Sequence, residues 1–357
     1  MLNHYSATLN FEYLKNIGSE GKNSQVHIAH DKQLDAEIVV KEIKKASFKD
    51  EAAFFNEAKI LYSSDHPNIV PIQYSCYDDA NIFITMPLFV KGSLNSLINS
   101  RPLTPSEILK YSIDFLCGLH HIHTKKLIHL DIKPTNILIS NSNDALLTDF
   151  GLSKYLDDAG YATVEQVYEL HQAPEMFKGN AATQQTDIYQ AGLTIYRMCA
   201  GNISFKGQLN KFIVPPGVFD KSKYEEAVLK GKYPFRNAIP IHIPKRLKKA
   251  IIKALEPDPA DRYNSVIEFL NDLCNIDVTH NWTPDFQENH SQFICNSDGK
   301  NYSVLIERVD DSNWNLITTK QASPDAEHRK ITEYCTKNIT FEEVYKQAKE
   351  ALQNNSL

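Results

Sequence analysis

The segment IHLDIKPTNILI, residues 128–139, places three polar side chains close together between two apolar runs. Asp131 could act as a base, Lys133 could neutralise negative charge, and Asn136 could supply an oxygen ligand to a metal ion. A polar turn between two strands is the simpler alternative, because Asp and Asn also bond the backbone of ordinary turns. Residues further along the chain decide between these two interpretations.

A second carboxylate follows at Asp149, in the sequence ALLTDFG that ends a short apolar strand. Asp131 and Asp149 both stand at predicted strand ends beside turns, where two carboxylates could meet one metal cluster. Mg²⁺ binds a few carboxylate and amide oxygens together with phosphate oxygens and water. Asp149 and Asn136 therefore predict a magnesium site, and a nucleotide is the natural source of the phosphate.

The N-terminal part of the chain has the residue pattern of a β-sheet that could position these residues. Residues 11–45 contain YLKNIG, SQVHIAHD and EIVVKEIK, runs rich in Val and Ile that predict antiparallel strands. The apolar spacing becomes helical from Phe48 to Tyr62, and strand character returns in HPNIVPIQYSCYD and NIFITMPLF. We expect a small sheet interrupted by one helix, with a lobe boundary near residues 87–92.

The chain beyond this boundary is predicted to be mostly helical. Thr104 and Glu107 form a T-x-x-E capping box at the start of a helix. The apolar residues that follow fall mainly on one face: Ile108, Tyr111, Ile113, Phe115, Leu116, Leu119 and Ile122.

Several motifs, in order, resemble those of the eukaryotic-like protein kinases. HLDIKPTN is similar to the catalytic loop of that family, DFG to its metal-binding loop, and APE at 173–175 to the end of its activation segment. The resemblance runs from about residue 11 to about residue 275. It implies an α+β, bilobal protein-kinase fold, with a kinase domain at 1–275, an N-lobe at about 11–86 and a C-lobe at about 92–275.

The resemblance also implies roles for individual residues, with ATP and Mg²⁺ as cofactors. Asp131 and Lys133 would be catalytic, and Asn136 and Asp149 would bind the metal. The residues expected at the nucleotide are Ile17, Gly18, Gly21, Val26, Lys41, Glu57, Met86 and Leu88, with Glu57 as the ion-pair partner of Lys41. Asp187 would lie on the long buried helix of the large lobe, and Arg262 would pair with Glu175 of APE.

Two of these assignments have structural alternatives. The loop IGSEGKNSQV has Gly18 and Gly21 but departs from the family spacing, because its Val26 comes one residue late. Its backbone amides could cover phosphates, or the loop could be an ordinary hairpin turn. Met86 matches the position at the back of the adenine pocket, whereas plain core packing predicts the same burial.

Two departures from the family pattern affect mechanism. Leu130 stands where an Arg usually precedes the catalytic Asp and binds phosphate on the activation segment. We therefore expect activity without phosphate on that segment, although it offers the acceptors Ser153, Tyr155, Tyr161, Thr163 and Tyr168. Gln190 replaces the usual Ser in TDIYQAG, which puts the local hydrogen bonding in doubt.

Composition and the remaining polar clusters point to few other functions. A formal charge of -6 gives no reason to expect a nucleic-acid or membrane partner, and the absence of an export signal or long apolar run predicts a cytoplasmic location. The six cysteines include no C-x-x-C pair, which argues against a zinc site or disulfide framework. His120, His121, His123 and His129 could form a metal cluster, but no Cys joins them.

Residues 280–357 lie outside the resemblance and predict an accessory α+β domain of unknown role. SQFICNSDGKNYSVLIERVDDSNWNLITTK predicts three strands joined by turns at 297–299 and 310–313. Thr340 and Glu343 predict a capped helix that follows. Its stripe of Phe341, Val344, Tyr345, Ala348 and Leu352 could pack on the strands or bind a partner.

The sequence is thus interpreted as that of an ATP-dependent protein kinase acting on a protein substrate that it does not identify. Lys133 after the catalytic Asp favours Ser or Thr acceptors in this family. Two alternatives remain: a pseudokinase scaffold that binds nucleotide or partners, and a kinase-fold enzyme that phosphorylates a non-protein acceptor.

Overall fold

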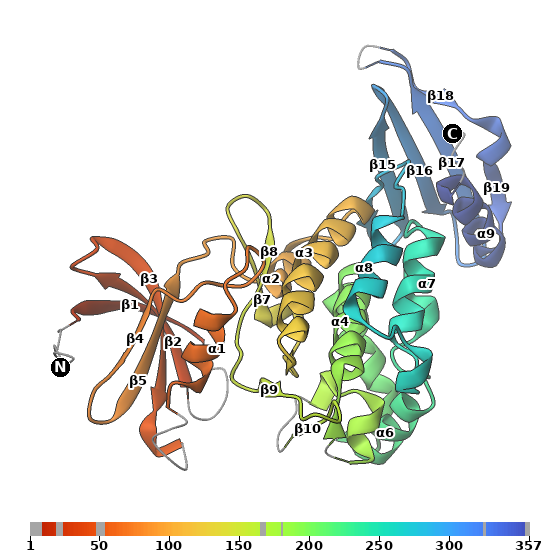
Figure 1. Ribbon diagram of the computed structural model, residues 1–357. Helices are drawn as coiled ribbons and strands as arrows, with labels where there is room; N and C mark the ends of the chain where they lie inside the picture. The colour runs from red at the N-terminus through yellow and green to blue at the C-terminus, as the bar shows by residue number, and fades with distance from the viewer. Residues whose placement is uncertain are drawn as a thin grey trace.

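Strands rich in Val and Ile near the N-terminus pair into one antiparallel sheet with the order β1-β2-β3-β5-β4. The computed structural model describes residues 9–18, 24–47, 54–164, 169–179, 181–323 and 326–353. The strands are β1 (Phe11–Gly18), β2 (Ser24–Asp31), β3 (Ala36–Lys44), β4 (Tyr74–Tyr77) and β5 (Asn81–Pro87), and helix α1 spans Asn56–Ser63. Figure 1 shows this sheet and α1 as a small lobe beside a larger helical one.

The helix predicted from Phe48 to Tyr62 is only partly described. Helix α1 begins at Asn56 and ends at Ser63, one residue beyond the predicted end. Residues 48–53 lie outside the described part of the chain. The chain then passes from the sheet to the helical lobe between Pro87 and Leu94, where the lobe boundary was predicted.

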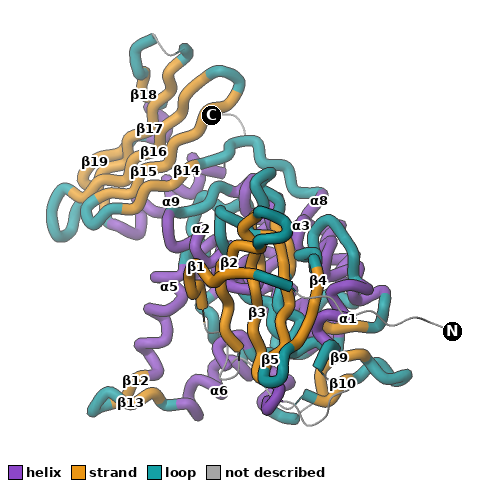
Figure 2. The backbone as a smooth tube through the Cα atoms, turned by 90° about the vertical axis from the view of Figure 1, so that its left-hand side faces the viewer, coloured by secondary structure: helices purple, strands orange, loops and turns teal. Residues whose placement is uncertain are grey.

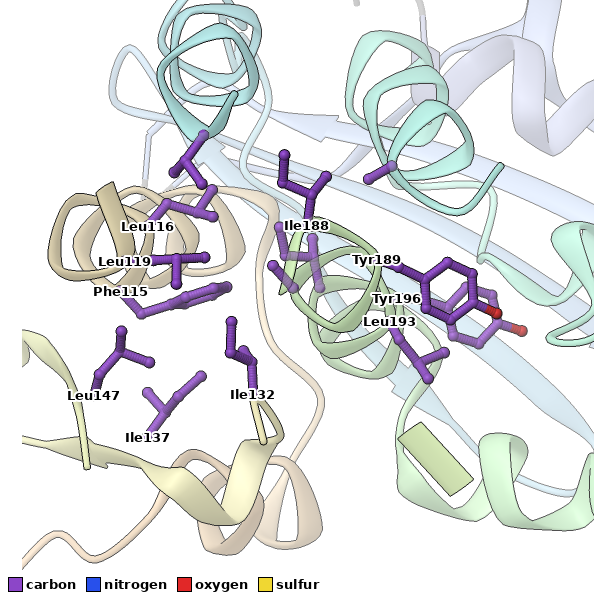
Figure 3. Packing of buried hydrophobic residues seen from close by; sticks show 14 of the residues in the cluster. Phe115, Leu116, Leu119, Ile132, Ile137, Leu147, Ile188, Tyr189, Leu193 and Tyr196 are labelled. Carbon is purple, nitrogen blue, oxygen red and sulfur yellow. The ribbon is translucent and has the colours of Figure 1, made fainter. Parts of the chain in front are cut away.

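Helix α3 (Pro105–Thr124) carries the predicted capping box and one wall of the main core. Thr104 Oγ1 accepts a hydrogen bond from Glu107 N, and Glu107 Oε2 accepts one from Thr104 N. Figure 3 shows Phe115, Leu116 and Leu119 of α3 packed close to Ile132, Ile137 and Leu147. Ile132 follows Asp131, Ile137 follows Asn136, and Leu147 lies two residues before Asp149, so the core fixes the backbone on which these polar residues lie.

Helix α4 (Gln184–Ala200) is buried on all sides along most of its length and contacts helices α3 (Pro105–Thr124), α5 (Asn202–Gly207) and α7 (Lys245–Ala254). Gly192 allows this helix to approach α7 closely, because a Cβ there would lie 2.7 Å from Ala254 Cβ. The helices are α2 (Leu94–Ser100), α3 (Pro105–Thr124), α4 (Gln184–Ala200), α5 (Asn202–Gly207), α6 (Lys221–Leu229), α7 (Lys245–Ala254) and α8 (Val266–Cys274). The short strands are β6 (Leu127–Ile128), β7 (Ile137–Ile139), β8 (Ala145–Leu147), β9 (Lys154–Tyr155), β10 (Ala162–Thr163), β11 (Ala181–Ala182), β12 (Ile213–Val214) and β13 (Val218–Phe219).

The C-terminal appendage is a second sheet with a helix on one face, as Figure 2 shows. Its elements are β14 (Thr283–Phe286), β15 (His290–Ser297), β16 (Lys300–Arg308), β17 (Trp314–Gln321), β18 (Arg329–Lys330), β19 (Thr336–Ile339) and α9 (Phe341–Gln353). The three predicted strands are confirmed as β15, β16 and β17. Strands β14, β18 and β19 were not predicted, because they are short, and β14 is interrupted by Pro284.

The appendage helix is capped as predicted, but the prediction of its apolar stripe is partly wrong. Glu343 N donates to Thr340 Oγ1, and Thr340 N donates to Glu343 Oε2. Val344, Ala348 and Leu352 are buried, whereas Phe341 is 52% exposed and Tyr345 37% exposed. The buried stripe continues instead through Ala351, and packs on residues of β15–β17 such as Phe293, Val304 and Leu316.

The predicted α+β class, a sheet lobe and a helical lobe with a C-terminal appendage, is therefore confirmed. Among the described residues, no helix combines the length and the apolar character needed to cross a lipid bilayer.

Candidate active site

The backbone of the catalytic-loop motif is held by one buried carboxylate on α4. Asp187 accepts hydrogen bonds from His129 N at 2.8 Å and Leu130 N at 2.7 Å. Its Oδ2 also lies 2.7 Å from Nε2 of His123 on α3. Leu130 is 1% exposed and has a φ of +68°, a left-handed conformation that needs support from its surroundings. Asp187 supplies that support at the residue before Asp131.

Gln190, one helical turn beyond Asp187, holds the loop on the other side of Asp131. Ile132 N donates to Gln190 Oε1 at 3.0 Å, and Gln190 Nε2 donates to Leu130 O at 2.9 Å. The doubt about hydrogen bonding at this position was therefore misplaced: the longer amide side chain provides both a donor and an acceptor. The sequence contained the residue, but no local pattern indicated that it would reach the loop.

Among the described residues, only one of the two carboxylate oxygens of Asp131 has hydrogen-bond partners. Its Oδ2 accepts hydrogen bonds from Lys133 Nζ and Asn136 Nδ2, both at 2.8 Å. Its Oδ1 is buried and has no hydrogen-bond partner among the described residues. Buried polar atoms are normally satisfied, so an unpaired carboxylate oxygen is a place where a donor such as a hydroxyl could bind.

Asp149 meets two N-lobe residues in a buried charge cluster. Lys41 Nζ on β3 donates to Asp149 Oδ1 at 2.7 Å and to the Glu57 carboxylate on α1 at 2.8 and 3.0 Å. Burial alone would raise the pKa of Asp149, but the charge and hydrogen bond of Lys41 lower it well below its usual value. Burial lowers the pKa of Lys41, but the two carboxylates raise it above its usual value. At neutral pH this cluster contains a carboxylate at Asp149 and an ammonium at Lys41.

The antiparallel pair β7–β8 brings Asn136 and Asp149 to the same end of a short ribbon. Ile137 pairs with Leu147, and just beyond this pair Thr148 N donates to Asn136 O at 3.0 Å. An ionised carboxylate and an amide oxygen are hard ligands of the kind that Mg²⁺ prefers. The donor set therefore fits the predicted magnesium site.

Three of the residues predicted at the nucleotide lie next to one another in the N-lobe sheet. Val26 on β2 pairs with Gly18 on β1 and with Lys41 on β3, which places these three residues side by side. Ile17 is partly exposed, and Leu88 is half-buried just after β5. Gly21 lies outside the described residues.

Met86 is buried at the end of β5 in a small apolar cluster. Val70 and Leu146 are its buried neighbours, and Leu138 of β7 packs against the same group. Leu138 was missed by sequence reasoning, although its place two residues after Asn136 was the available signal.

A bidentate ion pair anchors the end of the activation segment to the large lobe. Arg262 NH1 and NH2 donate to the Glu175 carboxylate at 3.0 and 2.7 Å, and Thr186 Oγ1 donates to Glu175 Oε1 at 2.8 Å. Nearby, His171 Nδ1 lies 3.1 Å from Ile132 O, and Arg197 contacts His171 Nε2 at 2.8 Å. Sequence reasoning missed these last two residues, because neither belongs to a recognised motif.

Three of the four clustered histidines of the helical lobe have separate structural partners. His123 contacts Asp187, Nε2 of His129 lies 3.1 Å from Thr148 O, and His121 stacks on His66. Within the described residues, no group of three or more His, Cys, Asp or Glu side chains is arranged to hold a metal ion.

Comparison with known families gives the same result as the geometry. The model described as "Protein kinase domain" matches residues 11–283. The chain belongs to the protein kinase family. Its relatives include a probable serine/threonine-protein kinase of Clostridium perfringens (strain 13 / Type A), which is 31% identical over 281 residues, covering 76% of this chain and 39% of that protein. Serine/threonine-protein kinase PrkC of Bacillus subtilis (strain 168) is 29% identical over 270 residues, covering 74% and 40%.

A third relative covers a similar part of this kinase. Serine/threonine-protein kinase PknD of Chlamydia muridarum (strain MoPn / Nigg) is 27% identical over 299 residues, covering 72% of this chain and 30% of that protein. The aligned part thus amounts to two fifths or less of each of these relatives.

Proposed function

We propose that this kinase transfers the γ-phosphoryl group of ATP to Ser or Thr hydroxyls of protein substrates. The observation that supports the proposal most strongly is the state of Asp131. One carboxylate oxygen is fixed by Lys133 and Asn136, and the other is left without a partner among the described residues. A substrate hydroxyl that donates to Oδ1 would satisfy this atom and would be oriented for attack.

Each remaining residue has a role that follows from the charge of the reaction. Phosphoryl transfer passes through a loose transition state, so catalysis consists mainly of positioning and electrostatic stabilisation. Asp131 orients the hydroxyl and accepts its proton, and Lys133 neutralises charge on the transferring group. Asn136 and Asp149 would hold Mg²⁺, which would supply positive charge to neutralise the phosphate oxygens.

The nucleotide is held from the N-lobe side. Lys41 contacts the α- and β-phosphates and is kept in place by Glu57, with which it already forms two hydrogen bonds. Ile17, Gly18, Gly21 and Val26 cover the nucleotide, and Met86 and Leu88 border the adenine pocket. This part of the proposal rests on the family pattern and on the pairing of Gly18, Val26 and Lys41 across the sheet.

Two finer features belong to the same proposal. Lys133 favours Ser and Thr acceptors, and the relatives named above are serine/threonine-protein kinases. Activity without phosphate on the activation segment is supported by Leu130, whose backbone is already held by Asp187 and Gln190. We further propose a kinase domain at 1–275, an accessory domain at 280–357 that could bind a partner, and a cytoplasmic location.

The test is to incubate the purified chain with labelled ATP, Mg²⁺ and a cell extract, and to map the phosphorylated residues by mass spectrometry. Asp131→Asn is the matched control, because it changes one atom and keeps the shape of the side chain. The proposal predicts label on Ser and Thr of extract proteins that is lost with the control. Label confined to Tyr, label only in non-protein molecules, or label that the control retains would each contradict it.

A further inference from the structure

One buried histidine joins the end of the activation segment to the catalytic loop. His171 closes a short 3₁₀ turn, Glu169–His171, two residues before Ala173 of the APE motif. It is 0% exposed, and its Nδ1 lies 3.1 Å from the main-chain oxygen of Ile132. Ile132 directly follows Asp131, so this contact reaches the loop beside the residue proposed as the base.

Arg197 on α4 determines which ring nitrogen of His171 carries the proton. Its NH1 donates to His171 Nε2 at 2.8 Å. A guanidinium has donors but no acceptor, so Nε2 must be the acceptor and the imidazole proton must be on Nδ1. Burial and, to a smaller extent, the charge of Arg197 lower the pKa of His171 well below its usual value, so the ring is neutral. Nδ1 therefore donates to Ile132 O.

The guanidinium of Arg197 is itself fixed by side chains from two neighbouring helices. Its Nε and NH2 donate to Asn202 Oδ1 at 3.0 and 2.7 Å, and NH2 also donates to Asn95 Oδ1 at 3.2 Å. Asn202 Nδ2 donates to Asn95 Oδ1 at 2.9 Å and to Asn99 Oδ1 at 2.8 Å. Asn95 and Asn99 lie on α2, and Asn202 begins α5. Arg197 is therefore held in the orientation that sets the proton of His171.

The contact with His171 completes the support of the backbone after Asp131. Ile132 N donates to Gln190 Oε1 at 3.0 Å, and Ile132 O also accepts a hydrogen bond from Thr194 Oγ1 at 3.3 Å. The peptide that contains Ile132 O leads directly to Lys133, whose Nζ lies 2.8 Å from Asp131 Oδ2. A rotation of this peptide would move Lys133 relative to Asp131, and such small displacements slow reactions that depend on alignment.

We propose that His171 and Arg197 are positioning residues of phosphoryl transfer, which couple the end of the activation segment to the catalytic loop without a phosphate group. The Nδ1–H of His171 fixes the peptide that follows Ile132, and Arg197 keeps the proton on that nitrogen. Both act through the loop and not on the reacting atoms. The inference rests on the proposed kinase function, whereas the position of the proton can be measured without any activity.

The first measurement determines the tautomer in the unmodified full chain. The protein is labelled with ¹⁵N at histidine, and a two-bond ¹H–¹⁵N correlation spectrum reports which ring nitrogen carries the proton. The signals of His171 are assigned from their loss in His171→Asn. We expect the Nδ1–H tautomer, because Nε2 accepts from Arg197. The Nε2–H tautomer would overturn the proposal whether or not any variant folds.

The second measurement compares two substitutions of His171 by initial rates per folded protein. His171→Leu removes the donor, whereas His171→Asn keeps an N–H near the position of Nδ1. We expect kcat to fall about tenfold in His171→Leu, with KM for ATP nearly unchanged, and to stay within about threefold of the parent in His171→Asn. His242→Leu is the matched control and should keep the parent rate, since His242 is 3% exposed and packs against Phe293 of the appendage.

A double-mutant cycle tests the part assigned to Arg197. Arg197→Met should lower kcat, and it should lower it little further in a His171→Leu background, because both changes act on one hydrogen bond. Fully additive losses would overturn the role of Arg197.

Two kinetic outcomes would overturn the role of His171. His171→Leu could keep the kcat of the parent, or His171→Leu and His171→Asn could lose kcat equally, which would indicate packing alone. Both outcomes require an active parent and leave the proposed function standing. A parent that transfers no phosphate to protein would instead contradict the proposed function and, with it, the positioning roles.

Discussion

The catalytic cleft and the appendage differ most in the polar groups that they bury. The cleft buries Lys41, Asp131, Asn136 and Asp187, each with hydrogen-bond partners in the protein. In the described part of the appendage core the buried side chains are mainly apolar; their polar groups are those of Thr318, Tyr302, Cys295 and the indole N–H of Trp282. Burying polar groups has a free-energy cost, so a chain that buries many at one place points to chemistry there. The appendage core, by contrast, is explained by packing.

The largest effect should come from the charge cluster of the cleft. Lys41→Met and Asp149→Ala should each reduce phosphotransfer more than about a hundredfold, because each removes a charge that we propose contacts phosphate or metal. Calorimetry separates the two variants: Mg²⁺-dependent nucleotide affinity should fall chiefly in Asp149→Ala. Unchanged Mg²⁺ dependence in that variant would contradict the metal role and favour the scaffold alternative.

A smaller loss is expected when the support of the catalytic loop is removed. Gln190→Ala deletes the hydrogen bonds to Ile132 N and Leu130 O, which flank Asp131. We expect kcat to fall about tenfold, roughly 1.4 kcal/mol in barrier height, with KM for ATP nearly unchanged. A purely structural role would instead leave the kcat of the folded fraction as it was, so steady-state rates should be normalised to folded protein.

A substitution in the appendage core should lower stability and leave activity nearly unchanged. Trp282→Phe removes the hydrogen bond to Leu352 O while keeping an aromatic ring, so the free energy of unfolding should fall by about 1 kcal/mol. Denaturant unfolding measures this change, and initial rates on a protein acceptor should stay within about twofold, about 0.4 kcal/mol. A large loss of activity with intact folding would show that the appendage takes part in catalysis and would break the contrast between the two regions.

The smallest effect is predicted for dephosphorylation of the activation segment. Leu130 cannot clamp a phosphate as an Arg would, and its backbone is already held by α4. Phosphatase-treated kinase, with Ser153, Tyr155, Tyr161, Thr163 and Tyr168 confirmed unmodified by mass spectrometry, should therefore keep its rate. A drop of more than about tenfold that recovers on rephosphorylation, roughly 1.4 kcal/mol, would count against this idea.

The same contrast explains how much could be predicted from the sequence. Short motifs predicted the groups that the structure brings together around Asp131 and around Lys41, because the chemistry requires fixed residue types at fixed spacings. The contact of Gln190 with the catalytic loop was not predicted, because its hydrogen bonds depend on tertiary packing. In the appendage, the alternation of apolar and polar residues predicted β15–β17 but not the short strands β14, β18 and β19. The burial of His242 was equally invisible, since its neighbours in IPIHIP look like any apolar loop.

The account depends most directly on the role of Asp131. The decisive measurement compares initial rates of phosphotransfer from ATP to a protein acceptor for the parent kinase and Asp131→Asn, with nucleotide affinity measured on the same samples. The account predicts that Asp131→Asn binds nucleotide nearly as well as the parent but transfers no measurable phosphate, because we propose that the hydroxyl binds the carboxylate oxygen that has no partner among the described residues. A rate within a few-fold of the parent would contradict it.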